Sequence, residues 1–146
     1  NETQPDPAML PAEPRARATT RALSRFHDSR IEPLLRAYFG QIAPANRDAD
    51  FIRDNASLLQ KRMQQLAQMV TPHPFLCGDI LSLADCGFAP SFAILNRLQT
   101  ILGFTVDLPD GLRAYEAALA SHPSVTDELQ GYYDALDSWA EAKLKS

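Results

Sequence analysis

The fold is decided by residues 75–95, which read FLCGDILSLADCGFAPSFAIL. In this stretch Ser82 stands three residues before Asp85, the spacing of a capping box with Asp in place of the usual Glu or Gln. Leu81 and Cys86 occupy the apolar positions on either side of the box. We therefore expect a helix to begin at Leu83.

This expected helix, from 83 to about 98, is apolar on nearly every side, and its only charged residues are Asp85 and Arg97. A helix of that kind lies at the centre of a bundle. Amphipathic helical patterns are found around it in the ranges 15–39, 48–70, 112–121 and 124–146, with Pro33 predicting a kink or break in the first. The sequence therefore predicts an all-α bundle of about five helices around an apolar central helix.

The first fourteen residues have a different composition, with prolines at 5, 7, 11 and 14. Such a density of proline favours an extended, stiff connection. We interpret residues 1–14 as an interdomain linker and residues 15–146 as a helical domain. The alternative is an ordinary frayed terminus.

Bulk composition excludes several classes of protein. The formal net charge of −4 gives no concentrated basic surface for nucleic acid. No apolar run approaches the roughly 20 residues that span a bilayer, and the polar N-terminus is not a signal peptide. With two cysteines, a disulfide scaffold is not expected, and a reducing cytoplasm is the expected location.

Three motifs resemble the C-terminal domain of the glutathione transferases, in closeness the broad bacterial branch. The stretch from Gly78 to Asp85 is similar to that family's glycine turn and capping box. Arg17-Ala18-x-x-Arg21-x-Leu23, with Asp28 beyond it, is similar to the opening of the family's first C-terminal helix. Asn1-Glu2-Thr3-x-Pro5-Asp6-Pro7 and Leu10-Pro11 look like the family's linker, and His122-Pro123-Ser124-Val125 adds a weaker match.

The resemblance implies a division of labour between two domains. The thiol-activating residue of the family lies in a thioredoxin-like N-terminal domain, and nothing in this chain resembles that domain. The full-length protein is thus implied to be a glutathione transferase and a homodimer, with glutathione as co-substrate and no covalently bound cofactor. This chain would supply the pocket for a small apolar electrophile and dimer contacts, and would be inactive alone.

Two other functions stay open. One is a non-catalytic protein-interaction module of the same fold, and the other is an unrelated free-standing bundle that binds a small ligand.

Candidate site residues follow from the resemblance and from position. Asp28 is the candidate for contact with glutathione bound by a partner subunit. The expected electrophile pocket lies between the first helix and the end of the last, and its members are Phe26, His27, Arg30, Leu34 and Trp139. Ser82, Asp85 and Gly78 are implied to be structural. No catalytic residue is expected in this chain.

Each of these residues also has a structural reading. A lone histidine on such a helix is more often a packing residue than a functional one, and most of the aromatic residues are core. Neither Cys77 nor Cys86 has a base or a helix N-terminus directly beside it, so catalysis by cysteine is not expected. No His pair has metal-ligand spacing, and we expect no metal site.

Overall fold

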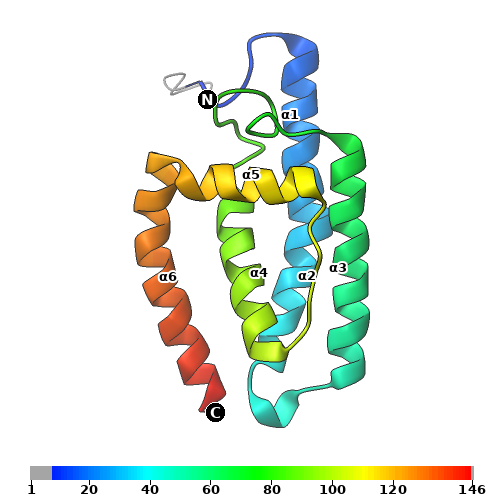
Figure 1. Ribbon diagram of the computed structural model, residues 1–146, viewed down its shortest axis with the longest axis vertical. Coiled ribbons are helices and arrows are strands. Elements are labelled where there is room, and N and C mark those ends of the chain that lie inside the picture. Colours follow the sequence, from blue (N-terminus) through cyan, green and yellow to red (C-terminus); the bar gives the residue numbers. More distant parts are fainter. Residues whose placement is uncertain (1–7, 146) are drawn as a thin grey trace.

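The computed structural model describes residues 8–145, and every regular element within them is helical (Figure 1). The α-helices are α1 (Pro14–Phe26), α2 (Glu32–Ala37), α3 (Ala49–Met69), α4 (Phe88–Leu102), α5 (Asp110–Ser121) and α6 (Pro123–Leu144). A π-helical turn, His27–Ile31, joins α1 to α2, so these elements form one continuous rod. The described chain thus consists of five helical bodies, and the predicted all-α bundle is confirmed.

The expected linker is only partly described. Asn1–Pro7 lies outside the described residues, and with it the first part of the linker motif. Beyond it, the segment before α1 contacts the turns that precede α4, because Leu83 N donates to Met9 O at 2.8 Å. Arg17 fixes the same segment by donating to Pro11 O and Ala12 O, each at 3.0 Å.

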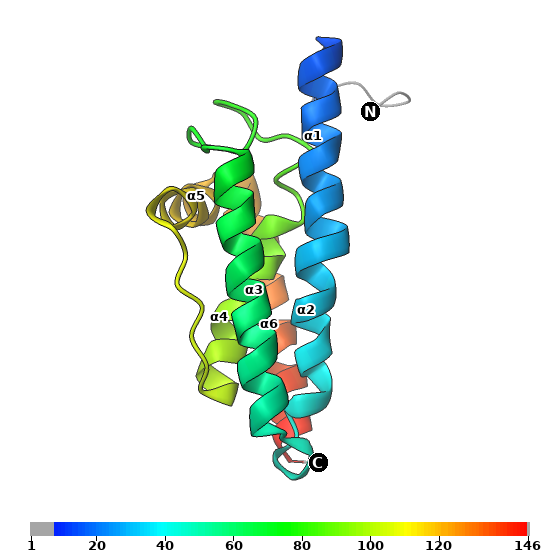
Figure 2. The ribbon, with the colours of Figure 1, turned by 90° about the vertical axis from the view of Figure 1, so that its right-hand side faces the viewer.

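The first rod begins where a side chain caps it. The Glu13 carboxylate accepts from Arg15 N at 2.9 Å and from Ala16 N at 2.6 Å, and Pro14 takes the first helical position. These two backbone hydrogen bonds lower the pKa of Glu13 below its ordinary value. The rod then runs antiparallel to α3 along the length of the molecule (Figures 1 and 2).

The break predicted at Pro33 takes the form of one inserted residue. Proline has no N–H to donate and its ring collides with the preceding turn of an α-helix. This collision is avoided because the helix widens to a π-helical turn just before Pro33. In that turn Glu32 N donates to His27 O, five residues back. Such an insertion turns every later side chain on the rod by about 100° relative to an uninterrupted helix.

The central helix predicted from the sequence is present as α4, but it starts later than predicted. Within Leu83–Gly87 the chain makes tight turns in which Asp85 N donates to Ser82 O and Phe88 N to Asp85 O. The α-helical pattern begins at Phe88, with Ser91 N donating to Gly87 O, so the expected start at Leu83 was wrong. The Ser82–Asp85 capping box therefore closes a turn that precedes the helix. In this turn the amide of Asp85 donates to the backbone carbonyl of Ser82.

The other helices surround α4. This burial is expected for a helix that has no polar face. Phe88, Phe92, Leu95 and Leu98 are all at most 3% exposed. The rings of Phe88 and Phe92 each lie 5.9 Å from that of Tyr115 on α5, which crosses the end of the bundle (Figure 1). No helix in the described residues is long and apolar enough to cross a membrane.

Candidate functional site

Two of the hollows beside α4 share the side chains of Pro90 and Tyr132. The first has a volume of about 430 Å³ and is named here the Cys86 hollow. The second has a volume of about 310 Å³ and is named the His27 hollow. Both are near the lower end of the range for small-molecule sites, about 300–1,000 Å³.

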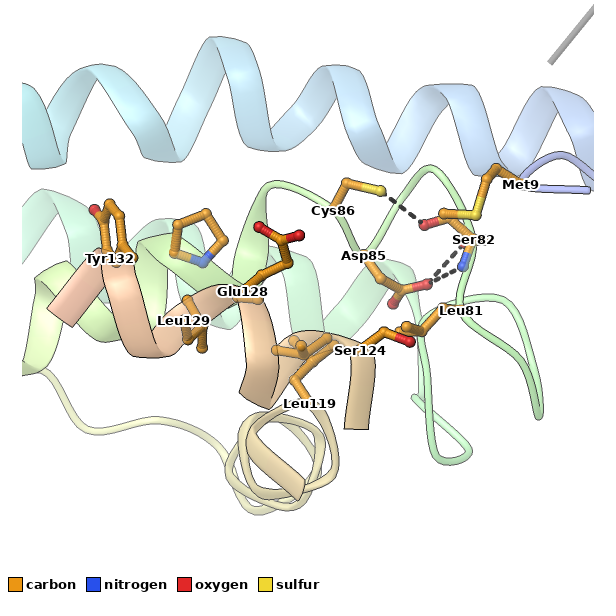
Figure 3. Close-up of a pocket in the computed structure, with 13 residues that line it drawn as sticks. Met9, Leu81, Ser82, Asp85, Cys86, Leu119, Ser124, Glu128, Leu129 and Tyr132 are labelled. Atoms are coloured by element: carbon orange, nitrogen blue, oxygen red, sulfur yellow. Dashed lines mark hydrogen bonds between the residues drawn. The ribbon is translucent and has the colours of Figure 1, made fainter. Parts of the chain in front are cut away.

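The Cys86 hollow is mainly apolar (Figure 3). It opens between the segment before α1, the start of α4 and the first turns of α6. Its lining residues are Met9, Leu81, Ser82, Asp85, Cys86, Ala89, Pro90, Leu119, Ser124, Val125, Glu128, Leu129 and Tyr132. Exposed apolar side chains continue beyond this lining, because the neighbouring Ile80 and Leu83 are 71% and 38% exposed.

Cys86 borders this hollow and is not packed within the bundle. It is exposed, in the turn before α4, and its thiol lies 3.6 Å from Ser82 O. Desolvation and, secondarily, the Asp85 carboxylate raise the pKa of this thiol. A thiol of raised pKa is mostly protonated and is a poor nucleophile.

The floor of the Cys86 hollow is held by one buried carboxylate. Asp85 is 1% exposed, and its Oδ2 accepts from both the amide and the hydroxyl of Ser82 at 2.8 Å (Figure 3). Its Oδ1 accepts from Leu76 N at 3.0 Å and from the hydroxyl of Tyr115 at 2.9 Å. Burial and this carboxylate raise the pKa of Tyr115 far above its usual range. These four hydrogen bonds connect the loop before α4 to α5 through Asp85.

Gly78 shapes the loop in front of this carboxylate. It has φ of +122°, a conformation that residues with a side chain rarely adopt, and it pairs with Phe75 in an antiparallel bridge. Leu76, between the two, thereby directs its amide toward Asp85.

The His27 hollow lies between the first rod, α4 and α6. Its lining residues are His27, Glu32, Leu35, Arg36, Phe39, Gly87, Pro90, Ser91, Ile94 and Tyr132. His27 and Glu32 are five residues apart and still face the same space, because the π-helical turn lies between them. At its solvent side Arg36 pairs with Glu32.

His27 itself is almost fully buried, with 5% exposure. Its Nδ1 lies 2.9 Å from Asp28 Oδ1 and its Nε2 lies 2.8 Å from Ser91 Oγ on α4. The imidazole packs edge-on against Phe88, with ring centroids 4.8 Å apart. It also lies so near Gly87 that a Cβ there would come within 2.5 Å of the ring.

The structure brings together only some of the residues expected to form the electrophile pocket. His27 lines the hollow, and Trp139 lies behind it, with its ring 4.8 Å from that of Phe39. Phe26 and Leu34 pack against the core instead, and Arg30 is exposed. After the inserted residue, the face of the rod that continues from His27 carries Glu32, Arg36 and Phe39.

Asp28 lies on the outside of the rod, where its side chain is 58% exposed. Arg36 and Ser91 line the His27 hollow as well, and neither was expected there from the sequence. Ser91 had one visible signal, since it is a small polar residue on an otherwise apolar helix. Among residues 8–145 no group of three or more His, Cys, Asp or Glu side chains is arranged to hold a metal ion.

Comparison with known proteins identifies the architecture. No protein-family profile matches the sequence. Among curated proteins, the maleylacetoacetate isomerase of Rattus norvegicus is 30% identical over 129 residues, which cover 84% of this chain and 57% of that enzyme.

Two solved structures, each 22% identical, are similar in fold. One is a glutathione S-transferase domain-containing protein of Marinobacter aquaeolei VT8, with a TM-score of 0.60 over 81% of this chain and 60% of that one. The other is the theta class glutathione S-transferase of Xanthomonas axonopodis pv. citri, with a TM-score of 0.63 over 86% of this chain and 66% of that one. The chain therefore spans between 57% and 66% of the length of these relatives. The resemblance carried by the motifs is confirmed at the level of the fold: the chain has the helical fold of the matched part of these glutathione S-transferase structures.

Proposed function

We propose that the full-length protein transfers glutathione to a small apolar electrophile, and that this chain supplies the electrophile side of the site. In that reaction the glutathione thiolate bonds to an electrophilic carbon of the second substrate. The observation that supports the proposal is the His27 hollow, a space of about 310 Å³ with apolar walls on the fold of this family.

The electrophile would lie against Leu35, Phe39 and Ile94, with Tyr132 on the α6 side. Phe39 is braced from behind by the edge of Trp139, so its ring is a fixed wall. Asp28 remains our candidate for contact with the glutathione of a partner subunit in a homodimer. Its exposed carboxylate on the outer side of the rod is accessible to such a ligand.

The Cys86 hollow would receive the domain that activates the thiol. The relatives have more than a third of their length beyond the part matched here. The segment before α1 passes the rim of this hollow at Met9, so a preceding domain would be delivered close to it. An apolar side chain of that domain would fill the hollow and remove Leu83 and Ile80 from water.

The test is glutathione conjugation of chlorodinitrobenzene by the full-length protein and by the present chain. We expect activity from the first and none from the second, because the thiol-activating residue is outside this chain. Phe39→Ala should raise the KM for the electrophile about tenfold and leave the KM for glutathione unchanged. Met69→Ala, which removes a half-exposed side chain on α3, is the matched control.

Conjugation by this chain alone would refute the proposed division between the domains. Absence of conjugation by the full-length protein would favour the alternative, a non-catalytic interaction module of the same fold.

The rat relative favours a second candidate reaction, isomerisation of an unsaturated keto acid such as maleylacetoacetate. Arg36 at the edge of the His27 hollow offers a cation for a substrate carboxylate. Turnover of maleylacetoacetate but not of chlorodinitrobenzene would select this candidate, and Arg36→Gln should then raise the KM for the keto acid.

A further inference from the structure

We infer that Asp28, His27 and Ser91 form a hydrolytic relay in which the hydroxyl of Ser91 attacks small, apolar carboxylic esters. This activity needs no glutathione and lies outside the proposed transferase reaction. It rests on side chains of this chain alone.

The hydrogen bonds fix the role of each atom. A carboxylate can only accept, so Asp28 Oδ1 accepts a hydrogen bond from the N–H of His27 Nδ1 across 2.9 Å. In the tautomer that this bond selects, Nε2 carries the lone pair and accepts from the hydroxyl of Ser91 across 2.8 Å. A serine that donates to an imidazole, itself held by a carboxylate, is the arrangement that activates a hydroxyl as a nucleophile.

Three unrelated features of the sequence combine to place these groups. The π-helical turn carries both His27 and Asp28, and such turns occur frequently at functional sites. Gly87 leaves the space that the imidazole enters, since any Cβ there would clash with it. Ser91 is one turn further along α4, and its hydroxyl donates to the histidine across 64 residues of sequence.

The site has room for a substrate. His27 and Ser91 both line the His27 hollow, whose volume of about 310 Å³ accommodates a small ester. The apolar walls from Leu35, Phe39 and Ile94 suit an aryl or short alkyl group. Arg36, which pairs with Glu32, and Tyr132 border the same space, and their N–H and O–H groups would be the donors to the oxyanion that develops on the carbonyl.

The reaction balances with water as the only other reactant. Ser91 Oγ bonds to the carbonyl carbon while its proton passes to His27 Nε2. The bond between that carbon and the alcohol oxygen breaks, and the departing alcohol takes the proton from His27. A water molecule, deprotonated by His27, then hydrolyses the acyl-serine, which releases the acid and restores the hydroxyl of Ser91.

The exposure of Asp28 limits the rate. Its side chain is 58% exposed, so solvent weakens the electrostatic attraction between this carboxylate and the imidazolium that forms during the reaction. We therefore expect activated aryl esters to be hydrolysed and amides to be left intact. General-base help from His27 should contribute about 100-fold, at the low end of the usual range.

The experiment measures hydrolysis of p-nitrophenyl acetate without glutathione. Ser91→Ala should lower the rate of the protein about 100-fold toward the buffer rate. The matched control is Ser57→Ala, which removes an exposed helical serine on α3 whose hydroxyl bonds only to the backbone of its own helix. This control should hydrolyse the ester as the unaltered protein does.

A second measurement does not depend on any variant folding correctly. The unaltered protein is treated with a fluorophosphonate and digested, and the labelled peptide is identified by mass spectrometry. We expect the label on Ser91 and none on Ser57. Label on Cys86 or Tyr132 alone, no label, or undiminished hydrolysis by Ser91→Ala would each overturn the inference, whatever the outcome of the conjugation assay.

Discussion

Gly87 shows how one absent side chain fixes a contact between two helical bodies. The His27 ring occupies the place where the Cβ of any other residue at position 87 would be. Gly87 has φ of −78°, which any residue can adopt, so the requirement here is for space and not for conformational freedom. The histidine that looked like a packing residue in the sequence is therefore both packed and hydrogen-bonded.

Gly87→Ala should lower the free energy of unfolding by about 1–3 kcal/mol, because the new methyl group displaces a buried ring. Gly131→Ala is the control: it lies in α6 with nothing near its would-be Cβ, so it should stabilise the protein by about 0.5–1 kcal/mol. Urea unfolding of both variants checks the opposite signs. Equal changes in the free energy of unfolding for the two variants would show that the close contact between Gly87 and His27 does not affect stability.

At the scale of the elements, the loop between α3 and α4 is organised by Asp85. The sequence identified it as half of a capping box, a device typically worth about 1 kcal/mol. In the structure the same carboxylate also binds Leu76 N and the hydroxyl of Tyr115, so it connects this loop to α5.

Asp85→Ala should therefore cost about 3–5 kcal/mol, since it leaves several buried donors without an acceptor. Asp79→Ala, at an exposed position in the same loop, should change the free energy of unfolding by less than about 0.5 kcal/mol. Chemical denaturation measures both. A loss of only about 1 kcal/mol for Asp85→Ala would mean that the bonds beyond the box contribute nothing.

Most elements could be predicted because they depend on local patterns. The apolar stretch before residue 98 gave the central helix, and Pro33 gave the break in the first rod. The form of that break could not be predicted. The inserted residue is recognised only from the hydrogen bond of Glu32 N to His27 O, which the sequence does not reveal. This single insertion brings Glu32 and Arg36 onto the face of His27, and Leu34, which also follows it, does not line the hollow.

The partner of His27 could not be predicted either. Its bond to Ser91 joins residues 64 positions apart, and no periodicity within one helix reports such a pairing. The capping box could be recognised in the sequence, but the tight turns that follow it could not. The predicted start of α4 was therefore too early.

For the whole molecule, two buried phenols make stability depend on alkaline pH. Desolvation raises the pKa of Tyr38, which is 0% exposed, to about 12 from an ordinary 10, and it raises that of Tyr115 as well. The folded state thus keeps a proton that the unfolded state releases. The stabilisation is complete below pH 10 and is lost as the pH rises from 10 toward 12.

We expect the free energy of unfolding to fall in that window by at most about 1.4 kcal/mol per pH unit for each tyrosine. Tyr38→Phe should reduce the slope, because the contribution of Tyr38 is removed and only the other tyrosines of raised pKa remain. Urea unfolding at successive pH values checks this, together with the tyrosinate absorbance of the folded protein. A pH-independent free energy of unfolding between 10 and 12 would contradict it.

The apolar rim of the Cys86 hollow makes a second prediction at this scale. The chain without a preceding domain should self-associate, since Ile80 and Leu83 remain exposed beside the hollow. Replacing both by serine should weaken the association, whereas serine at the exposed Leu58 and Met69 on α3 should not. Sedimentation that shows a monomer at high concentration would exclude this surface as a docking face.

The central claim is that this chain is the electrophile-binding half of a glutathione transferase. The most direct test is to sequence the coding region immediately upstream of Asn1. We predict a thioredoxin-like domain there, with a Ser, Tyr or Cys early in it and a cis-proline loop. A start codon close to Asn1, or an unrelated upstream domain, would contradict the claim and leave a helical binding module.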